Sequence, residues 1–174
     1  MSAAAALDVT VRPMRESDWP DVRRIYSEGI ATGQATFEAE APDWSRFDGS
    51  RLASHRLVAE APDAGILGWA AVSAVSGRPV YSGVVEHSIY VSEAARGRRI
   101  GSVLLRSLIA STERDGIWTL QASVFPENEQ SLNLHLAHGF RVVGRREKIA
   151  RMAYGPAAGQ WQDTVLIERR TRVF

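Results

Sequence analysis

The stretch from Val84 to Ile109 most constrains the fold of this chain, because its hydrophobic period changes in the middle. Val84–Val91 is rich in β-branched and aromatic residues, which is typical of a strand. After it, apolar residues recur on one helical stripe, formed by Ile100, Val103, Leu104, Leu108 and Ile109. The loop between the two periods contains Arg96, Gly97, Arg98, Arg99 and, at the helix start, Gly101. The sequence therefore predicts a strand, a basic glycine-containing loop and a helix in direct succession.

The chemistry of this loop favours phosphate binding. Backbone N–H groups at a helix N-terminus carry partial positive charge, and arginine adds bidentate donors for phosphate oxygens. The alternative is a solvated basic loop before an ordinary helix, and a short glycine and arginine pattern does not decide between the two. The loop has no lysine followed by serine or threonine, and no Gly-x-Gly-x-x-Gly, so the pattern is neither a P-loop nor a dinucleotide fingerprint.

Arg96–Gly101 resembles the acyl-CoA pyrophosphate loop of the GNAT superfamily of N-acetyltransferases, which is written Gln/Arg-x-x-Gly-x-Gly/Ala. Arg99 stands where that pattern usually has glycine. Further matching segments follow the order and spacing of the superfamily: Gly77–Tyr81, Glu86–Val91, Asn128–Leu132 and His138–Phe140. The resemblance runs from about Val11 to about Glu168. It is greatest to the branch that contains phosphinothricin and methionine sulfoximine acetyltransferases.

Length and composition indicate one compact domain. The chain has 174 residues, of which 45% are hydrophobic, and we expect a single domain over 1–174 with an ordered core of about 8–170. A formal net charge of +1 gives no general attraction to nucleic acid or to a membrane surface. The chain has no cysteine, which excludes disulfides and thiolate chemistry and fits a cytoplasmic location. Met1–Ala6 lacks the basic start of a signal peptide, and no apolar run approaches the roughly 20 residues of a membrane span.

The order of predicted elements indicates a mixed α/β sheet. Strands are predicted over Val9–Met14, Arg56–Glu60, Ile66–Val75, Val84–Val91, Trp118–Phe125, Phe140–Ala150 and Thr164–Glu168. Helices are predicted from the N-cap Ser17 to Glu28, over Asp43–Ser54, from Ile100 to Asp115, and from the N-cap Asn128 to Gly139. The resemblance adds a mostly antiparallel central sheet with flanking helices, in which neighbouring central strands splay to admit the pantetheine arm.

Glu86 is the first candidate catalytic residue, because a carboxylate is costly to bury inside an apolar strand. The alternative is an outward-facing side chain on an exposed sheet face. An amine arrives mostly as ammonium, which cannot attack a thioester, and a carboxylate whose pKa is raised by partial burial can accept its proton. In the resembling branch a glutamate at this position has the role of general base.

His135 is the second candidate, on a helix among Leu132, Leu134 and Leu136. From the residues alone, a core or surface histidine is the simpler interpretation. The resemblance implies a histidine near the departing sulfur, where it protonates the CoA thiolate or polarises a water chain together with Glu86. We interpret His138 as structural. The four histidines do not have metal-ligand spacing, so no metal site is predicted.

The resemblance also implies an acetyl-CoA site. Asn128 caps a helix and contacts pantetheine, while main-chain groups of the central strand receive the thioester and stabilise its oxyanion. The expected CoA-binding residues are Ser88, Ile89, Tyr90, Val91, Arg96, Gly97, Arg98, Arg99, Ile100, Gly101, Ser102 and Asn128. At Arg99 we expect an ordinary negative φ, because the left-handed conformation costs about 1 kcal/mol or more in any residue except glycine.

The acceptor side is predicted from the same resemblance. Its expected residues are Phe37, Glu38, Arg78, Tyr81 and Val85, with Arg78 meeting a carboxylate of the acceptor. The predicted reaction is direct transfer of the acetyl group of acetyl-CoA to the α-amino group of a small amino acid such as phosphinothricin, methionine sulfoximine or methionine sulfone, in a homodimeric enzyme. The alternatives are another small amine or a protein N-terminus as acceptor, or an acyl-CoA-binding module without turnover. A nucleic-acid module fits less well, because stacking aromatics do not alternate with the basic residues.

Overall fold

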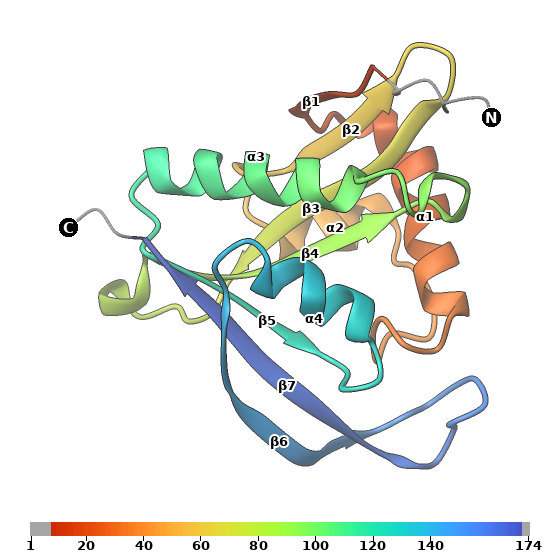
Figure 1. Ribbon diagram of the computed structural model, residues 1–174, viewed down its shortest axis with the longest axis vertical. Helices are drawn as coiled ribbons and strands as arrows, with labels where there is room; N and C mark the ends of the chain where they lie inside the picture. Colours follow the sequence, from red (N-terminus) through yellow and green to blue (C-terminus); the bar gives the residue numbers. More distant parts are fainter. Residues whose placement is uncertain (1–7, 172–174) are drawn as a thin grey trace.

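The protein is described by a computed structural model for residues 8–171, and these residues form a seven-stranded sheet with helices on both faces (Figure 1). The strands are β1 (Thr10–Pro13), β2 (Leu57–Ala61), β3 (Gly65–Ala74), β4 (Val84–Val91), β5 (Thr119–Val124), β6 (Arg141–Arg151) and β7 (Trp161–Arg170). The helices are α1 (Trp19–Ala31), α2 (Trp44–Ser50), α3 (Ile100–Arg114) and α4 (Glu129–Leu136). Short 3-10 turns are η1 (Glu16–Asp18), η2 (Pro79–Tyr81) and η3 (Glu93–Ala95). The strand order is β1-β2-β3-β4-β5-β7-β6, which confirms the predicted mixed α/β class.

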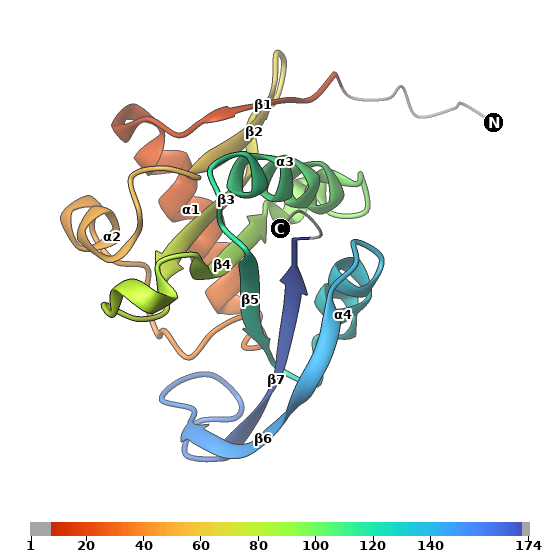
Figure 2. The same ribbon diagram turned by 90° about the vertical axis from the view of Figure 1, so that its left-hand side faces the viewer.

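The centre of the sheet opens between β4 and β5. Every neighbouring pair of strands is antiparallel except this one, which is parallel and has only three register pairs. The last of them joins Glu86 to Gln121. Beyond it the two strands diverge, as Figures 1 and 2 show. The predicted splay of the central strands is therefore confirmed, and it begins at the candidate catalytic glutamate.

Two hydrophobic layers hold the sheet between the helices. In Figure 2, α1 and α2 cover one face, and α3 and α4 cover the other. The predicted stripe of α3 packs inward, with Ile100, Leu104 and Leu108 fully buried against β2, β3 and β4. The α1/α2 face is aromatic, and its core includes Tyr26, Phe47 and Trp69. Full burial of one large apolar side chain stabilises the fold by about 1.5–3 kcal/mol, so both layers fix the position of β4 firmly.

The first helix differs from the prediction at both ends. Asp18, and not Ser17, is the N-cap residue of α1, and the helix continues past Glu28 to Ala31. The cause is the buried Asp18 carboxylate, which accepts hydrogen bonds from the Arg12 guanidinium at 2.8 Å and from the Arg15 N–H at 2.7 Å. These bonds hold residues 16–18 in a 3-10 turn ahead of the helix.

The second helix and the last strand also differ from the prediction. Asp43 caps α2 by accepting from the Arg46 N–H at 2.8 Å, but the helix ends at Ser50, because Arg51 is extended with φ −119° and ψ 149°. β7 begins at Trp161, in the segment predicted as a loop, since that residue pairs with Arg151 of β6. Most side chains of β6 are exposed, so this hairpin has no clear hydrophobic alternation in its sequence. Within the described residues no helix is long and apolar enough to cross a membrane.

Candidate active site

Two cavities meet at the opening between β4 and β5. We call the first the Glu86 pocket, and its volume is about 270 Å³. The second, of about 490 Å³, runs to the basic loop before α3, and we call it the loop groove. Both cavities are lined by Gln34, Ala35, Ile89, Tyr90, Asn128, Ser131 and His135. A ligand in the loop groove can therefore present one end to the Glu86 pocket.

The loop groove gathers most of the residues predicted to bind CoA. Its lining includes Ile89, Tyr90, Val91, Arg96, Gly97, Arg99, Ile100, Gly101, Ser102 and Asn128. Ser88 lines the Glu86 pocket instead, and Arg98 lines neither cavity. Asn128 caps α4 as predicted, accepting from the Ser131 N–H at 3.1 Å. Gly101 has a packing role as well, because a Cβ there would lie 3.1 Å from the Leu134 side chain.

The expected negative φ at Arg99 is wrong. Arg99 is the N-cap of α3 and has φ 64° and ψ 14°, a left-handed conformation. The chain must turn sharply between Gly97, whose φ is 77°, and the buried Ile100 that starts the helix, so the backbone keeps a shape that suits glycine. That conformation costs an arginine about 1–2 kcal/mol. In return, the Arg99 side chain lines the loop groove.

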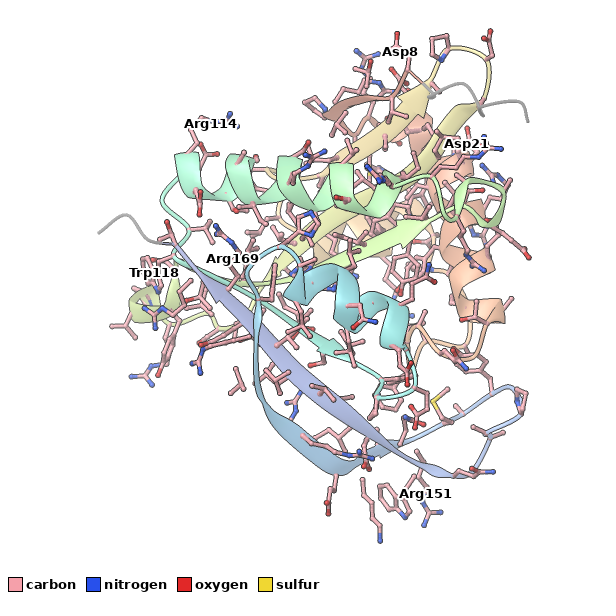
Figure 3. All side chains as sticks on the ribbon, viewed as in Figure 1. Asp8, Asp21, Arg114, Trp118, Arg151 and Arg169 are labelled. Carbon is pink, nitrogen blue, oxygen red and sulfur yellow. The ribbon has the colours of Figure 1, made fainter. Side chains whose placement is uncertain are left out.

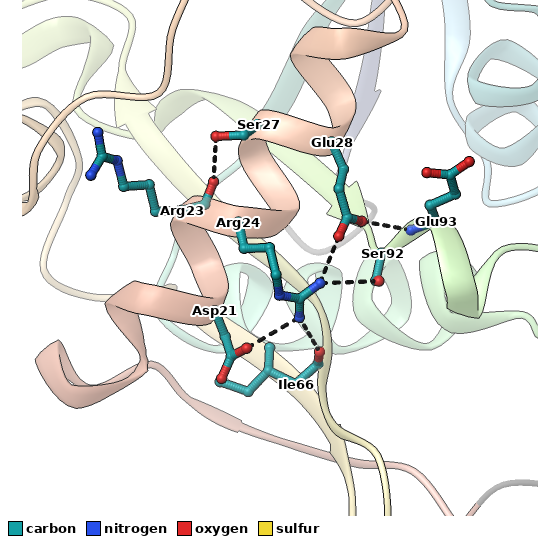
Figure 4. A network of polar contacts seen from close by, with 8 residues as sticks. All are labelled: Asp21, Arg23, Arg24, Ser27, Glu28, Ile66, Ser92 and Glu93. Atoms are coloured by element: carbon teal, nitrogen blue, oxygen red, sulfur yellow. Dashed lines mark hydrogen bonds and ion pairs between the residues drawn. The ribbon is translucent and has the colours of Figure 1, made fainter.

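A polar network on α1 anchors the segment that leads into this loop (Figure 4). The Glu28 carboxylate accepts from the Glu93 N–H at 2.7 Å and from the Arg24 guanidinium at 2.6 Å. Arg24 also donates to the Ser92 hydroxyl at 3.5 Å and to the Ile66 carbonyl at 3.5 Å. These contacts connect α1 and β3 with the first turn after β4, so the start of the loop groove is positioned by three elements.

Glu86 lies at the last paired position of β4, with its side chain half-buried. The Gln121 amide donates a hydrogen bond to its carboxylate at 3.3 Å. The side chain lines the Glu86 pocket together with two further charged residues, Glu38 and Arg51. Its position gives a carboxylate at the point where the two central strands separate, which suits a proton acceptor for a group entering the pocket.

The neighbouring residue, His87, forms a buried pair with His135. Their Nε2 atoms are 2.8 Å apart, and both rings contact Phe140. His135 Nδ1 donates to the Ser131 carbonyl at 2.6 Å. Burial lowers the pKa of both rings below the usual histidine value, and the neighbouring His135 lowers that of His87 further. Both imidazoles are therefore neutral at pH 7.

The predicted acceptor residues separate into two groups. Phe37 and Glu38 line the Glu86 pocket, where the Phe37 ring lies 4.9 Å from that of Phe125. Arg78 and Tyr81 lie outside both cavities, with the Arg78 guanidinium stacked 5.5 Å above the Tyr81 ring. Val85 is buried in the core that packs against α3. In this chain none of these last three residues lines the Glu86 pocket.

Several pocket residues were not identified from the sequence. They include Tyr26, Arg51, His87, Ser131 and Thr164. Only His87 carried a usable signal, because strand alternation turns it to the opposite face from Glu86, toward the helices after β4. His138, interpreted as structural, bonds to the Leu134 carbonyl at 2.8 Å and the Ser102 hydroxyl at 2.9 Å. Residues 8–171 contain no cluster of three or more His, Cys, Asp or Glu side chains that could hold a metal ion.

Comparison with known proteins gives the family of this chain. The model of the acetyltransferase (GNAT) family matches residues 14–140. The phosphinothricin N-acetyltransferase of Alcaligenes faecalis is 36% identical over 168 residues, which cover 92% of this chain and 81% of that protein. The L-methionine sulfoximine/L-methionine sulfone acetyltransferase of Pseudomonas aeruginosa is 25% identical and is covered over 94% of its length by 93% of this chain.

A solved structure extends the similarity to three dimensions. It is the phosphinothricin acetyltransferase of Sinorhizobium meliloti in complex with AcCoA, a GNAT superfamily protein. Its TM-score is 0.80 at 28% identity, over 93% of this chain and 88% of that one. The resemblance noted in the sequence is confirmed by the family model, by these relatives and by the fold. The chain belongs to the acetyltransferase (GNAT) family.

Proposed function

We propose that the protein transfers the acetyl group of acetyl-CoA to the α-amino group of a small amino acid, with phosphinothricin, methionine sulfoximine and methionine sulfone as the first acceptors to test. The main support is that the loop groove and the Glu86 pocket meet at the opening between β4 and β5. The names of the relatives support the same substrate class.

The basic loop and the start of α3 suit the phosphates of CoA, since arginines and helix N–H groups converge there. The pantetheine arm would then follow β4 past Asn128 to the opening. Beyond Glu86, β4 has no strand partner on its β5 side, so backbone groups on that side are available to the thioester. An N–H there stabilises the oxyanion that forms when the amine attacks.

Glu86 takes the proton that the amine must lose, directly or through water. The neutral amine attacks the thioester carbonyl and the C–N bond forms. The nitrogen then loses its second excess proton, the C–S bond breaks to release the CoA thiolate, and the thiolate takes up a proton. His135 is our candidate for supplying that proton. The chain has no cysteine to form a thioester intermediate, which supports direct attack within a ternary complex and also a cytoplasmic location.

The test is a panel of amines with acetyl-CoA, in which turnover is read as free thiol. We expect free amino acids with a polar tetrahedral side-chain end to exceed simple amines and a peptide N-terminus in kcat/KM. Initial rates should give intersecting lines, as a ternary complex requires. No thiol release above background with any amine, together with tight CoA binding, would instead indicate an acyl-CoA-binding module without turnover.

We also propose a homodimer. Several apolar side chains on the β6–β7 hairpin and its end are about half exposed, namely Val142, Val143, Ile149 and Trp161. The Arg151 guanidinium lies 4.7 Å from the Trp161 ring, and Figure 3 shows Arg151 at the end of the hairpin remote from Asp8. A second copy would cover this apolar surface. Light scattering at micromolar concentration tests the proposal, and a monomer alone would refute it.

A further inference from the structure

Arg51 is an unpaired charge in the wall of the Glu86 pocket. It follows α2 directly and is partly buried. Its Nε atom is buried and has no hydrogen-bond partner within residues 8–171, where the side chain also makes no ion pair with a carboxylate. Its close neighbours are the Phe47 ring, 5.8 Å from the guanidinium carbon, and the Tyr26 hydroxyl.

The next arginine along the chain provides a contrast. Arg56 is buried, and its guanidinium donates to the Leu52 carbonyl at 2.6 Å, to the Asp48 carboxylate at 2.5 Å and to the Arg51 carbonyl at 2.9 Å. The fold thus pairs Arg56 with a carboxylate and leaves Arg51 without one. Partial burial of a cation without a partner is costly, so an anion that arrives with a ligand would be stabilised there.

No other side chain of the described pocket forms an ion pair with Arg51. Burial raises the pKa of both Tyr26 and Tyr90, so these hydroxyls stay neutral. Glu38 and Glu86 line the same pocket, yet neither forms an ion pair with Arg51. The pocket therefore offers a carboxylate for an ammonium group and, separately, a guanidinium for an anion. A free amino acid carries both of these groups on one carbon.

We infer that Arg51, rather than Arg78, binds the α-carboxylate of the acceptor and thereby selects free amino acids. This inference rests on the proposed function. A guanidinium binds a carboxylate through two parallel N–H donors, and such charged hydrogen bonds are stronger than neutral ones. Arg78 lies outside the pocket and is stacked on Tyr81, so the same contact is not open to it within this chain.

The experiment compares a free amino acid with its methyl ester as acceptors for the wild type and for Arg51→Gln, Arg51→Lys, Arg78→Gln and Arg46→Gln. Arg46 is an exposed arginine on α2, the helix that Arg51 follows, and is the matched control. We expect the wild type and Arg46→Gln to prefer the free acid by about 10- to 100-fold in kcat/KM, the range for one charged hydrogen-bonded pair. Arg51→Gln should use acid and ester equally, Arg51→Lys should keep part of the preference, and Arg78→Gln should keep all of it.

A readout without turnover separates this inference from the proposed function. Calorimetry measures the binding of the N-acetylated amino acid to each variant loaded with CoA. Binding that is lost in Arg51→Gln while CoA affinity and thermal unfolding stay unchanged supports the inference, even if no amine on the panel is acetylated. The inference is overturned if Arg51→Gln keeps the preference for the free acid or the affinity for the N-acetylated amino acid. It is also overturned if Arg78→Gln loses either of them.

Discussion

The Nε2 atoms of His87 and His135 lie 2.8 Å apart, and this contact fixes where the protons of both rings reside. The Ser131 carbonyl can only accept, so the proton of neutral His135 is on Nδ1 and its Nε2 is bare. His87 must then donate from its own Nε2. Its Nδ1 then carries no proton, and this atom is buried without a hydrogen-bond partner in the described part of the chain.

This arrangement constrains the proposed role of His135. Both of its nitrogens already have partners, so protonation of the CoA thiolate by His135 requires one of these hydrogen bonds to break. The Ser131 hydroxyl lies 3.4 Å from His135 Nδ1, and both Ser131 and His135 line the two cavities. His87 is a positioning residue in this scheme, since it acts on the acetyl group only through His135.

The histidine pair predicts energetic coupling. His87→Phe and His135→Phe should each lower the free energy of unfolding by about 1–3 kcal/mol, because each leaves a nitrogen of the other ring buried and unsatisfied. The double variant should lose less than the sum, by about 0.5–3 kcal/mol. Urea denaturation of the four proteins measures this coupling. As a control, His135→Phe is combined with His55→Asn, and the two losses of unfolding free energy should add. His55 is a buried histidine outside the site, and its Nδ1 lies 2.8 Å from the Ser111 hydroxyl.

The same pair predicts a loss of stability in mild acid. Burial lowers the folded-state pKa of His87 below the unfolded value of about 6.5, so below that pH the unfolded chain binds a proton that the folded protein does not. Stability is therefore fully present above about pH 6.5 and falls as the pH is lowered further. Between pH 7.5 and 5.5, the loss of unfolding free energy should be about 1 kcal/mol smaller in His87→Phe than in the wild type. Equal losses in the two proteins would contradict a neutral buried His87.

Local signals in the sequence were sufficient to predict the elements around the opening between β4 and β5. β4 has the predicted bounds, Val84–Val91, because β-branched residues fill it and a turn precedes it. The Asn128 cap and the start of α3 at Ile100 were also predicted, since capping and helical stripes depend on neighbouring residues only. The same locality explains why Phe37 and Glu38 were linked to the site by resemblance alone, because no period marks their segment.

Long-range contacts determined what the sequence did not show. Whether an arginine is paired depends on partners distant in the chain, so Arg51 and Arg56 look alike in sequence although only the second is satisfied. The left-handed Arg99 is a similar case. Its own preference is for negative φ, and the requirement to place Ile100 in the core overrides that preference.

Replacement of the candidate base should affect chemistry more than binding. Glu86→Gln keeps the size of the side chain and its contact with Gln121, but it removes the proton acceptor. We expect kcat to fall by about 10²-fold or more, the usual scale for loss of a general base, with CoA affinity nearly unchanged by calorimetry. Glu127→Gln, on the exposed turn before α4, is the matched control. Wild-type turnover by Glu86→Gln at neutral pH would show that another group accepts the proton.

The left-handed Arg99 predicts opposite effects of one substitution on stability and on CoA binding. Arg99→Gly relieves a backbone strain of about 1–2 kcal/mol, which more than offsets the larger chain entropy of glycine in the unfolded state. Arg98→Gly relieves no such strain, because Arg98 is not among the residues with positive φ, and it should destabilise slightly. We therefore expect Arg99→Gly to be more stable than Arg98→Gly by about 1 kcal/mol or more in thermal or urea unfolding without ligand.

Since Arg99 lines the loop groove and Arg98 does not, Arg99→Gly should also bind CoA up to about fivefold more weakly, the range for one exposed ion pair. If Arg99→Gly were as destabilising as Arg98→Gly, the left-handed conformation would not be strained, and if it bound CoA as the wild type does, the Arg99 side chain would have no part in holding the phosphates.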